Sequence, residues 1–145
     1  MEYLLSLLIA MNTRTVTIEN PVQLDLTQEE CVYREGNLPI RNNNPLNITY
    51  GGATKKWVDY GKAEINTTKD GRKFLKFCRV EDGFDAGRML LKDVYGDMTP
   101  ESAMRKFSNG GYGALHNKKI SEMTDNEFDD FVEAIATREG FYNES

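Results

Sequence analysis

Short stretches rich in β-branched and aromatic residues occupy the middle of the chain. They fall at residues 48–50, 56–58, 63–68 and 73–80 and are typical of strands. The dipeptide Asp70-Gly71 separates the last two stretches, and Asp-Gly is a strong signal for a tight hairpin turn. The pattern therefore predicts a small antiparallel sheet.

The spacing of apolar residues becomes helical in the second half of the chain. It predicts one helix over residues 82–95, and Thr99-Pro100 predicts the start of a second, with an N-cap residue followed by Pro at the first position. Thr124 to Glu127 has the sequence of a capping box and predicts a third start. The predicted fold class is α+β, mainly α, with a small antiparallel β-hairpin sheet and three or more helices.

The first 34 residues are organised differently from the rest. Residues 1–11 are apolar but shorter than the roughly 20 residues that a membrane-spanning helix needs, so we expect no transmembrane span. Residues 13–26 alternate like a strand but are interrupted by Pro21, which is typical of an edge or an arm. We interpret residues 1–34 as an N-terminal arm or docking segment and residues 35–145 as the main domain.

Charge is distributed unevenly along the chain. The formal net charge is −5, which argues against a general nucleic-acid binder. Residues 41–119, however, carry 15 basic and 9 acidic side chains, whereas residues 120–145 carry 1 and 8. The middle of the chain is therefore basic and suits an anionic partner.

The residues that bind metals or act as nucleophiles are scarce. The chain has two cysteines, Cys31 and Cys78, and one histidine, His116, which we expect on the surface. The cysteines are too few and too far apart for a metal site, and we expect two reduced thiols. We predict no metal and no cofactor, so acid-base chemistry would depend on carboxylates.

One glutamate lies on the apolar face of the last predicted helix. At about 100° per residue, the apolar residues between 128 and 135 form a stripe, and Glu139 falls in its middle, in the last turn. Loss of solvation and the negative end of the helix dipole both raise the pKa of such a carboxyl. A neutral carboxylic acid beside a cleft is what a general acid for glycosidic cleavage requires. The alternative is that the helix frays at Arg138 and Glu139 points into water.

The segment Arg41-Asn42-Asn43-Asn44-Pro45-Leu46-Asn47-Ile48 resembles a known family motif. It matches seven of the eight positions of R-N-N-N-P-G-N-I, found in phage and prophage peptidoglycan-degrading proteins of the lytic transglycosylase kind, which are often carried in the virion. Weaker similarities follow in the family's order at residues 77–95, 99–107 and 131–142. The resemblance spans residues 41–142 and leaves out the leader.

The resemblance implies a lysozyme-like domain in circularly permuted order, with the sheet first and the glutamate helix last. It implies that Glu139 cleaves the β-1,4 bond between N-acetylmuramic acid and N-acetylglucosamine, as general acid and then general base. A transglycosylase would activate the sugar's own 6-hydroxyl, whereas a water-using lysozyme would need a second carboxylate. The candidates for that carboxylate are Asp59, Glu64, Asp82 and Asp85, and Glu35 is a weaker alternative acid.

The same resemblance suggests residues that bind the glycan. Asparagine amides could bond N-acetyl groups, an arginine could contact a muramyl carboxylate, and tyrosines could stack on sugar rings. These candidates are Arg41, Asn42, Asn43, Asn44, Asn47, Tyr112 and Tyr142. The alternatives are that some asparagines only hold the loop, that the arginine forms a salt bridge to the last helix, and that the tyrosines only pack.

Leu46 stands where the family motif has glycine. If that glycine needs a positive φ, Leu46 is strained or the loop differs. Leu46 therefore favours a rival, a non-catalytic virion structural or wall-binding protein that keeps the fold. A peptidase is a third and weaker option, because metal-ligand and nucleophile motifs are missing.

The resemblance also suggests where the protein acts. We expect packaging in a phage virion, action on the bacterial cell wall or periplasm, and an arm that binds other virion proteins.

Overall fold

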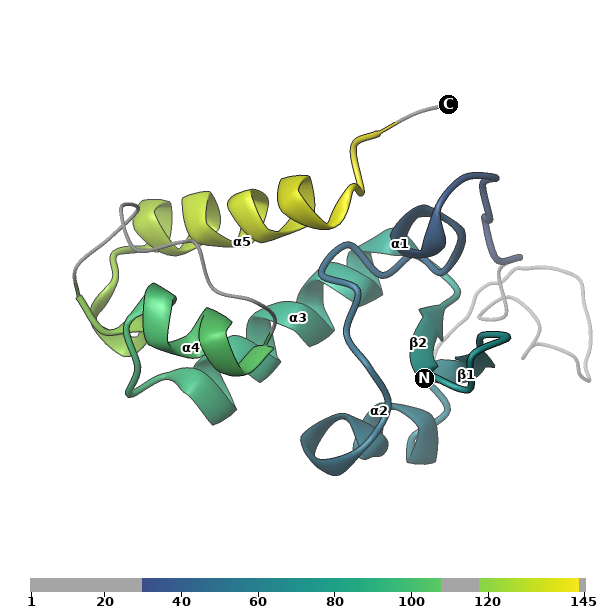
Figure 1. The fold of residues 1–145 in the computed structure, drawn as a ribbon, viewed down its shortest axis with the longest axis horizontal. Coiled ribbons are helices and arrows are strands. Elements are labelled where there is room, and N and C mark those ends of the chain that lie inside the picture. The colour runs from purple at the N-terminus through teal and green to yellow at the C-terminus, as the bar shows by residue number, and fades with distance from the viewer. Residues whose placement is uncertain (1–29, 108–117, 144–145) are drawn as a thin grey trace, which may run out of the picture. The chain divides into compact units, whose positions relative to one another are not determined.

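The computed structural model describes residues 30–107 and 118–143 (Figure 1). The residues from Val32 onward belong to one unit, which is described here by itself. The predicted arm, residues 1–34, lies almost entirely outside the described residues, so its boundary and its docking role stay predictions. In the part of the chain that is described, no helix is long and apolar enough to cross a membrane.

The described residues are mainly helical, with one small sheet. The antiparallel sheet pairs β1 (Ala63–Thr67) with β2 (Lys73–Phe77). The five α-helices of the described residues are α1 (Leu38–Arg41), α2 (Lys55–Asp59), α3 (Val80–Tyr95), α4 (Pro100–Phe107) and α5 (Asp125–Glu139), with 3₁₀ turns at Gly52–Thr54 and Ile120–Glu122. The predicted class, α+β and mainly α with a hairpin sheet, is confirmed.

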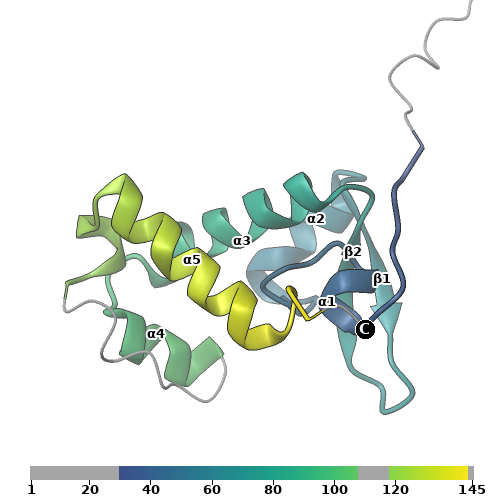
Figure 2. The ribbon, with the colours of Figure 1, turned by 90° about the horizontal axis from the view of Figure 1, so that it is seen from above.

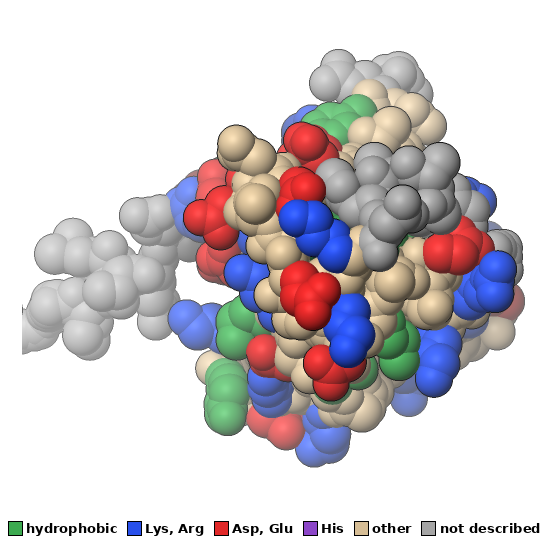
Figure 3. Space-filling view, turned by 90° about the vertical axis from the view of Figure 1, so that its left-hand side faces the viewer, with side chains coloured by type: hydrophobic (Ala, Val, Ile, Leu, Met, Phe, Trp, Pro, Cys, Tyr) green, Lys and Arg blue, Asp and Glu red, His purple; other side chains and the backbone are tan. Residues whose placement is uncertain are grey.

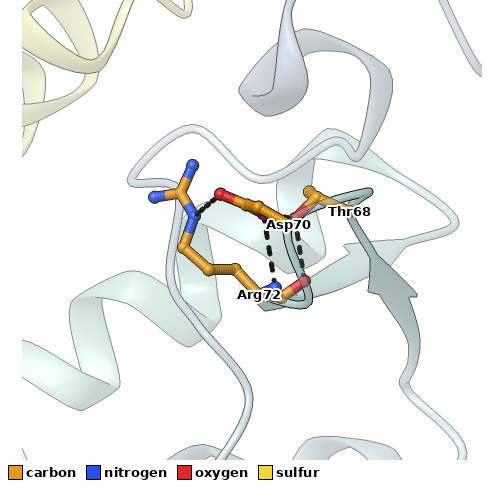
Figure 4. Close-up of polar contacts among 3 residues, drawn as sticks. All are labelled: Thr68, Asp70 and Arg72. Atoms are coloured by element: carbon orange, nitrogen blue, oxygen red, sulfur yellow. Dashed lines mark hydrogen bonds and ion pairs between the residues drawn. The ribbon is translucent and has the colours of Figure 1, made fainter.

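The hairpin turn forms where the Asp-Gly signal predicts it. The carboxylate of Asp70 accepts hydrogen bonds from the Thr68 hydroxyl and from Nε of Arg72, the latter at 3.1 Å (Figure 4). These contacts lower the pKa of Asp70. Gly71 has φ +89°, a left-handed conformation that glycine adopts without steric cost. Local side-chain bonding and one glycine thus set the register of β1 against β2.

The strand predicted over residues 56–58 is wrong, because this segment is helix α2. The Thr54 hydroxyl accepts from the Gly51 N–H at 3.0 Å and donates to the Thr49 carbonyl at 2.7 Å, which folds the chain into a turn. An i,i+4 ion pair between Lys55 and Asp59, at 3.0 Å, follows within the helix. The stretch predicted over residues 48–50 contributes only an isolated bridge, Thr49 to Phe74.

The three predicted helices are confirmed. Helix α3 covers the predicted range and begins two residues earlier, at Val80. Helix α4 starts at Pro100, as the N-cap and proline signal predicts. At the start of α5, the Thr124 hydroxyl accepts from the Glu127 N–H at 3.2 Å, and the Glu127 carboxylate accepts from the Thr124 N–H at 2.8 Å. The capping box is therefore complete.

Helix α3 lies at the centre of the unit (Figures 1 and 2). It contacts both α5 and the loop of residues 42–47, which contains the asparagines. The contact with α5 includes an Arg88–Asp129 ion pair of 3.2 Å. On the loop side, a Cβ on Gly83 would come within 1.9 Å of the Asn43 carbonyl oxygen, and one on Gly87 within 2.7 Å of Leu46. Two glycines one turn apart therefore let the loop backbone pack directly on α3.

Acidic and basic side chains are interspersed on the face shown in Figure 3. Two of the surface ion pairs involve α4 and the start of α5. Arg105 pairs with Glu101 at 3.1 Å, and Lys118 pairs with Glu127 at 2.8 Å. Part of the acidic surplus of the last helix is thus balanced locally.

The expectation of two reduced thiols is wrong. Cys31 and Cys78 are both disulfide-bonded, and neither is a free thiol. The sequence hides this because pairing depends on where the fold brings distant residues, and two cysteines alone do not show that.

Candidate functional site

Glu139 is the last residue of α5, and the helix does not fray there. Gly140 follows with φ +92°. Its N–H donates to the Thr137 carbonyl at 3.1 Å, and the Phe141 N–H donates to the Ala136 carbonyl at 3.0 Å. This pair of bonds is a Schellman motif. Nδ2 of Asn37 also donates to the Gly140 carbonyl at 2.8 Å. The backbone under Glu139 is therefore fixed, and the fraying alternative is wrong.

The Glu139 carboxyl is half-buried at this helix end. Burial raises the pKa of Glu139, whereas the bond from Asn47 and the charge of Arg138 act in the opposite direction without cancelling the effect of burial. Nδ2 of Asn47 donates to Oε1 of Glu139 at 3.3 Å. The carboxyl thus holds its proton to a higher pH than an ordinary glutamic acid, as periodicity predicts, and it has one directional partner.

Asn47 reaches Glu139 because of an unusual backbone conformation. Its φ is +54°, a left-handed value that asparagine tolerates better than most residues with a side chain. Its N–H donates to the Asn44 carbonyl at 2.9 Å, which closes the turn. Its Oδ1 is buried and has no hydrogen-bond partner among the described residues. One end of the amide is thus used and the other is unsatisfied.

Asn47 also lines a groove of about 250 Å³ between the segment 47–54 and the second half of α3. Helix α3 contributes Leu90, Val94 and Tyr95, and α4 contributes Lys106. No carboxylate is among the described residues that line this groove. Glu139 is therefore connected, through Asn47, to a neutral and partly apolar surface with one cation.

Three of the predicted substrate-binding asparagines belong to the interior. Asn42, Asn43 and Asn44 are buried, with exposures of 0%, 2% and 0%. Nδ2 of Asn43 donates to the Phe77 carbonyl at 2.9 Å, and Oδ1 of Asn42 accepts from Asn66 at 2.8 Å. These amides hold the loop against the sheet, so their assignment to substrate is corrected.

Asn44 has the most complete set of bonds of the three. Its Nδ2 donates to the carbonyls of Ile48 and Leu75, both at 2.9 Å, and its Oδ1 accepts from the Ile48 N–H at 3.0 Å. Each partner is a backbone group. Without this side chain the Leu75 carbonyl and the Ile48 N–H would lose this bond in the interior, whereas the Ile48 carbonyl also accepts from the Leu75 N–H at 3.2 Å. Asn44 is therefore a structural residue of the loop.

Two other predicted substrate residues, Arg41 and Tyr142, are absent from the described groove lining. Arg41 is exposed, and its guanidinium donates to the Gly36 carbonyl at 3.2 Å. The Tyr142 hydroxyl donates to Glu133 at 2.5 Å, and burial together with this carboxylate raises the pKa of Tyr142 to about 12. Tyr112 lies outside the described residues, as does His116. Of the six predicted substrate residues that the structure describes, it brings only Asn47 into hydrogen-bond contact with Glu139.

Leu46 is accommodated without backbone strain. Among the described non-glycine residues, positive φ values occur at Asn43 and Asn47 and not at Leu46. The Leu46 side chain is fully buried and packs in the space left by Gly87 of α3. The loop thus places its left-handed conformations on asparagines, and the leucine fills the core.

The candidates for a second carboxylate lie elsewhere. Asp59 is paired with Lys55, and Glu64 is exposed. Asp82 and Asp85 line a different groove, of about 420 Å³. The weaker alternative acid, Glu35, is exposed. Within residues 30–107 and 118–143, no group of three or more His, Cys, Asp and Glu side chains could hold a metal ion.

Sequence reasoning missed the wall of the groove. Leu90 and Val94 follow an ordinary helical pattern, and Lys106 is one lysine among many, so no local signal marks them. The groove arises only when α3, α4 and the segment 47–54 come together. No protein-family model, curated protein or solved structure matches the chain. The family resemblance therefore depends on the motifs alone.

Proposed function

We propose that this protein cleaves the β-1,4 bond between N-acetylmuramic acid and N-acetylglucosamine in peptidoglycan, with Glu139 as the catalytic acid. The observation that carries the proposal is the Asn47–Glu139 hydrogen bond. It joins the two features that the sequence marks independently, the R-N-N-N-P-L-N-I segment and the glutamate on the apolar face, across 92 positions of the chain. A half-buried carboxyl with a raised pKa, hydrogen-bonded to a residue that lines a groove, supports acid catalysis.

The proposed reaction needs only one carboxyl. Protonated Glu139 gives its proton to the glycosidic oxygen as the bond to C1 of the muramyl sugar breaks. The resulting carboxylate takes the proton of the sugar's 6-hydroxyl, whose oxygen then bonds to C1 and forms a 1,6-anhydro ring. No water is consumed, and the glutamate ends protonated again.

Asn47 has a defined part in this cycle. Its side-chain Nδ2 donates to Oε1 of Glu139, a hydrogen bond that favours the ionised carboxyl and opposes the effect of burial. The amide therefore stabilises the carboxylate that appears after the first proton transfer. The left-handed backbone of Asn47 holds the amide at the position where that charge develops.

We further propose a lysozyme-like domain that is carried in a phage virion and acts on the bacterial wall or periplasm. The disulfide-bonded state of Cys31 and Cys78 agrees with an oxidising compartment of this kind. The basic balance of residues 41–119 suits an anionic wall. The rival, a wall-binding virion protein without activity, loses its main sequence argument because Leu46 fits the loop without strain.

The test is a turbidity assay on purified peptidoglycan. We expect wild type to lyse it, and Glu139→Gln to be slower by about 10²- to 10⁴-fold, the usual contribution of a general acid. Asp130→Asn is the matched control, because it removes an exposed carboxylate from the same helix, and it should lyse like wild type.

Equal lysis by wild type and Glu139→Gln would remove the catalytic assignment. If no variant lyses the wall but all sediment with it, the protein is the non-catalytic binding module.

A further inference from the structure

The groove that Asn47, the hydrogen-bond partner of Glu139, helps to line has one charged side chain among its described lining residues, Lys106 of α4. The rest of that lining is neutral and consists of Asn47, Ile48, Thr49, Gly51, Ala53, Thr54, Leu90, Val94 and Tyr95. The Lys106 side chain is exposed. A neutral groove with a single cation is electrostatically selective, because its surface favours one negative charge at one place.

Two consecutive cations of α4 are used differently. Arg105 forms an i,i+4 ion pair with Glu101 at 3.1 Å and is absent from the groove lining. Lys106 is about 100° further around the helix and lines the groove. The two residues carry the same charge on the same helix, so they form a natural matched pair for experiment.

The proposed substrate offers a single kind of charge on its sugar backbone. The hydroxyl and N-acetyl groups of both sugars are neutral, whereas the lactyl ether of N-acetylmuramic acid carries a carboxyl group. This carboxyl is ionised at neutral pH on every muramyl residue that has no stem peptide amide-linked to it. A polymer of N-acetylglucosamine alone has no such group. An ammonium in the groove can therefore distinguish the two polymers.

We propose that Lys106 is a specificity-determining residue that binds the free muramyl carboxylate of glycan without stem peptides and makes the groove prefer such muramic-acid glycans to neutral N-acetylglucosamine polymers. This inference rests on the proposed function and names the feature of the substrate that the groove recognises. Lys106 acts on binding, whereas Glu139 acts on the bond. The two roles are therefore separable.

The experiment measures binding by calorimetry, with the full chain carrying Glu139→Gln so that the ligand is not consumed. The ligands are a tetrasaccharide of alternating N-acetylglucosamine and N-acetylmuramic acid and the N-acetylglucosamine tetramer. Lys106→Gln should weaken binding of the muramyl ligand about two- to fivefold, the upper range of an exposed ion pair, and leave the neutral ligand unchanged. Lys106→Arg should keep most of the preference, and Arg105→Gln should keep all of it.

Equal weakening of both ligands by Lys106→Gln would overturn the inference, as would no weakening of either. An equal effect of Arg105→Gln would also overturn it, because it would indicate general electrostatic attraction. If the wild type fails to lyse peptidoglycan while Lys106 still controls muramyl binding, the proposed activity fails and this inference stands. If neither ligand binds, both the inference and the groove's assignment to glycan fail. Thermal unfolding of each variant identifies any that do not fold.

Discussion

Asn44 and Asn47 lie three positions apart in one segment, and the fold uses the same side chain in two ways. Asn44 is fully buried, and its three hydrogen bonds all go to backbone groups. Asn47 is half-buried, bonds Glu139 and leaves its Oδ1 without a partner among the described residues. The hydrogen bonds of Asn44 hold the loop, because buried polar groups need partners. The Asn47 amide lines the groove and keeps one acceptor unused there. The motif therefore contains one asparagine that stabilises the fold and another that contacts the candidate catalytic carboxyl.

The largest expected effect is a difference in the free energy of unfolding between variants of Asn44 and of Asn47. Asn44→Ala leaves the Leu75 carbonyl and the Ile48 N–H without this partner in the interior, and we expect it to lower the free energy of unfolding by about 2 kcal/mol or more. Asn47→Gly keeps the left-handed backbone accessible, and we expect a change below about 1 kcal/mol. Urea denaturation at pH 7 measures both. Equal losses would mean that the two amides are not used differently.

The ionised Glu139 carboxylate should lower the free energy of unfolding at neutral pH. Because its folded pKa is raised, folding favours the protonated carboxyl, and stability falls as the pH rises from about 4.5 through the folded pKa. The neutral Glu139→Gln should therefore be more stable than wild type at pH 7, by about 1 kcal/mol or less, and equally stable near pH 3.5. Thermal unfolding at both values of pH measures the difference. If the two proteins differ in stability by the same amount at pH 3.5 and at pH 7, ionisation of Glu139 is not the cause of the difference.

The smallest expected effect concerns the coupling of Asn47 to Glu139. The hydrogen bond from the Asn47 side-chain amide favours the ionised carboxyl, so Asn47→Gly should raise the pKa of Glu139 further. The alkaline limb of the pH profile of lysis should move in the same direction, because the acid then keeps its proton to higher pH. Carbon NMR of the Glu139 carboxyl measures the shift directly. An unchanged titration curve would show that the bond has no influence on the proton.

Local patterns in the sequence predicted the elements whose signals are local. The Asp70-Gly71 turn, the Thr124 capping box and the helix starting at Pro100 each depend on a few adjacent residues, and all three are present. The apolar face of α5 also placed Glu139 correctly, because a helix repeats its geometry along its whole length. What failed locally was residues 56–58, where hydrogen bonds of Thr54 turn the chain into a helix.

The candidate site could be predicted only in part, because its geometry depends on long-range contacts. Nothing in three consecutive asparagines shows that β2 supplies acceptors for two of them, or that Gly83 and Gly87 let the loop pack on α3. The sequence therefore assigned all four asparagine amides to substrate. The lysine of the groove was missed for the same reason.

The central claim is that this chain breaks the glycan backbone of peptidoglycan through Glu139. The most direct measurement is mass spectrometry of the soluble products released from purified peptidoglycan by wild type and by Glu139→Gln. We predict new glycan ends in the wild-type digest, with 1,6-anhydro-muramyl termini, and about a hundredth as many or fewer from the Gln variant in the same time. Products cut only at peptide bonds, or identical glycan ends from both proteins, would contradict the assignment.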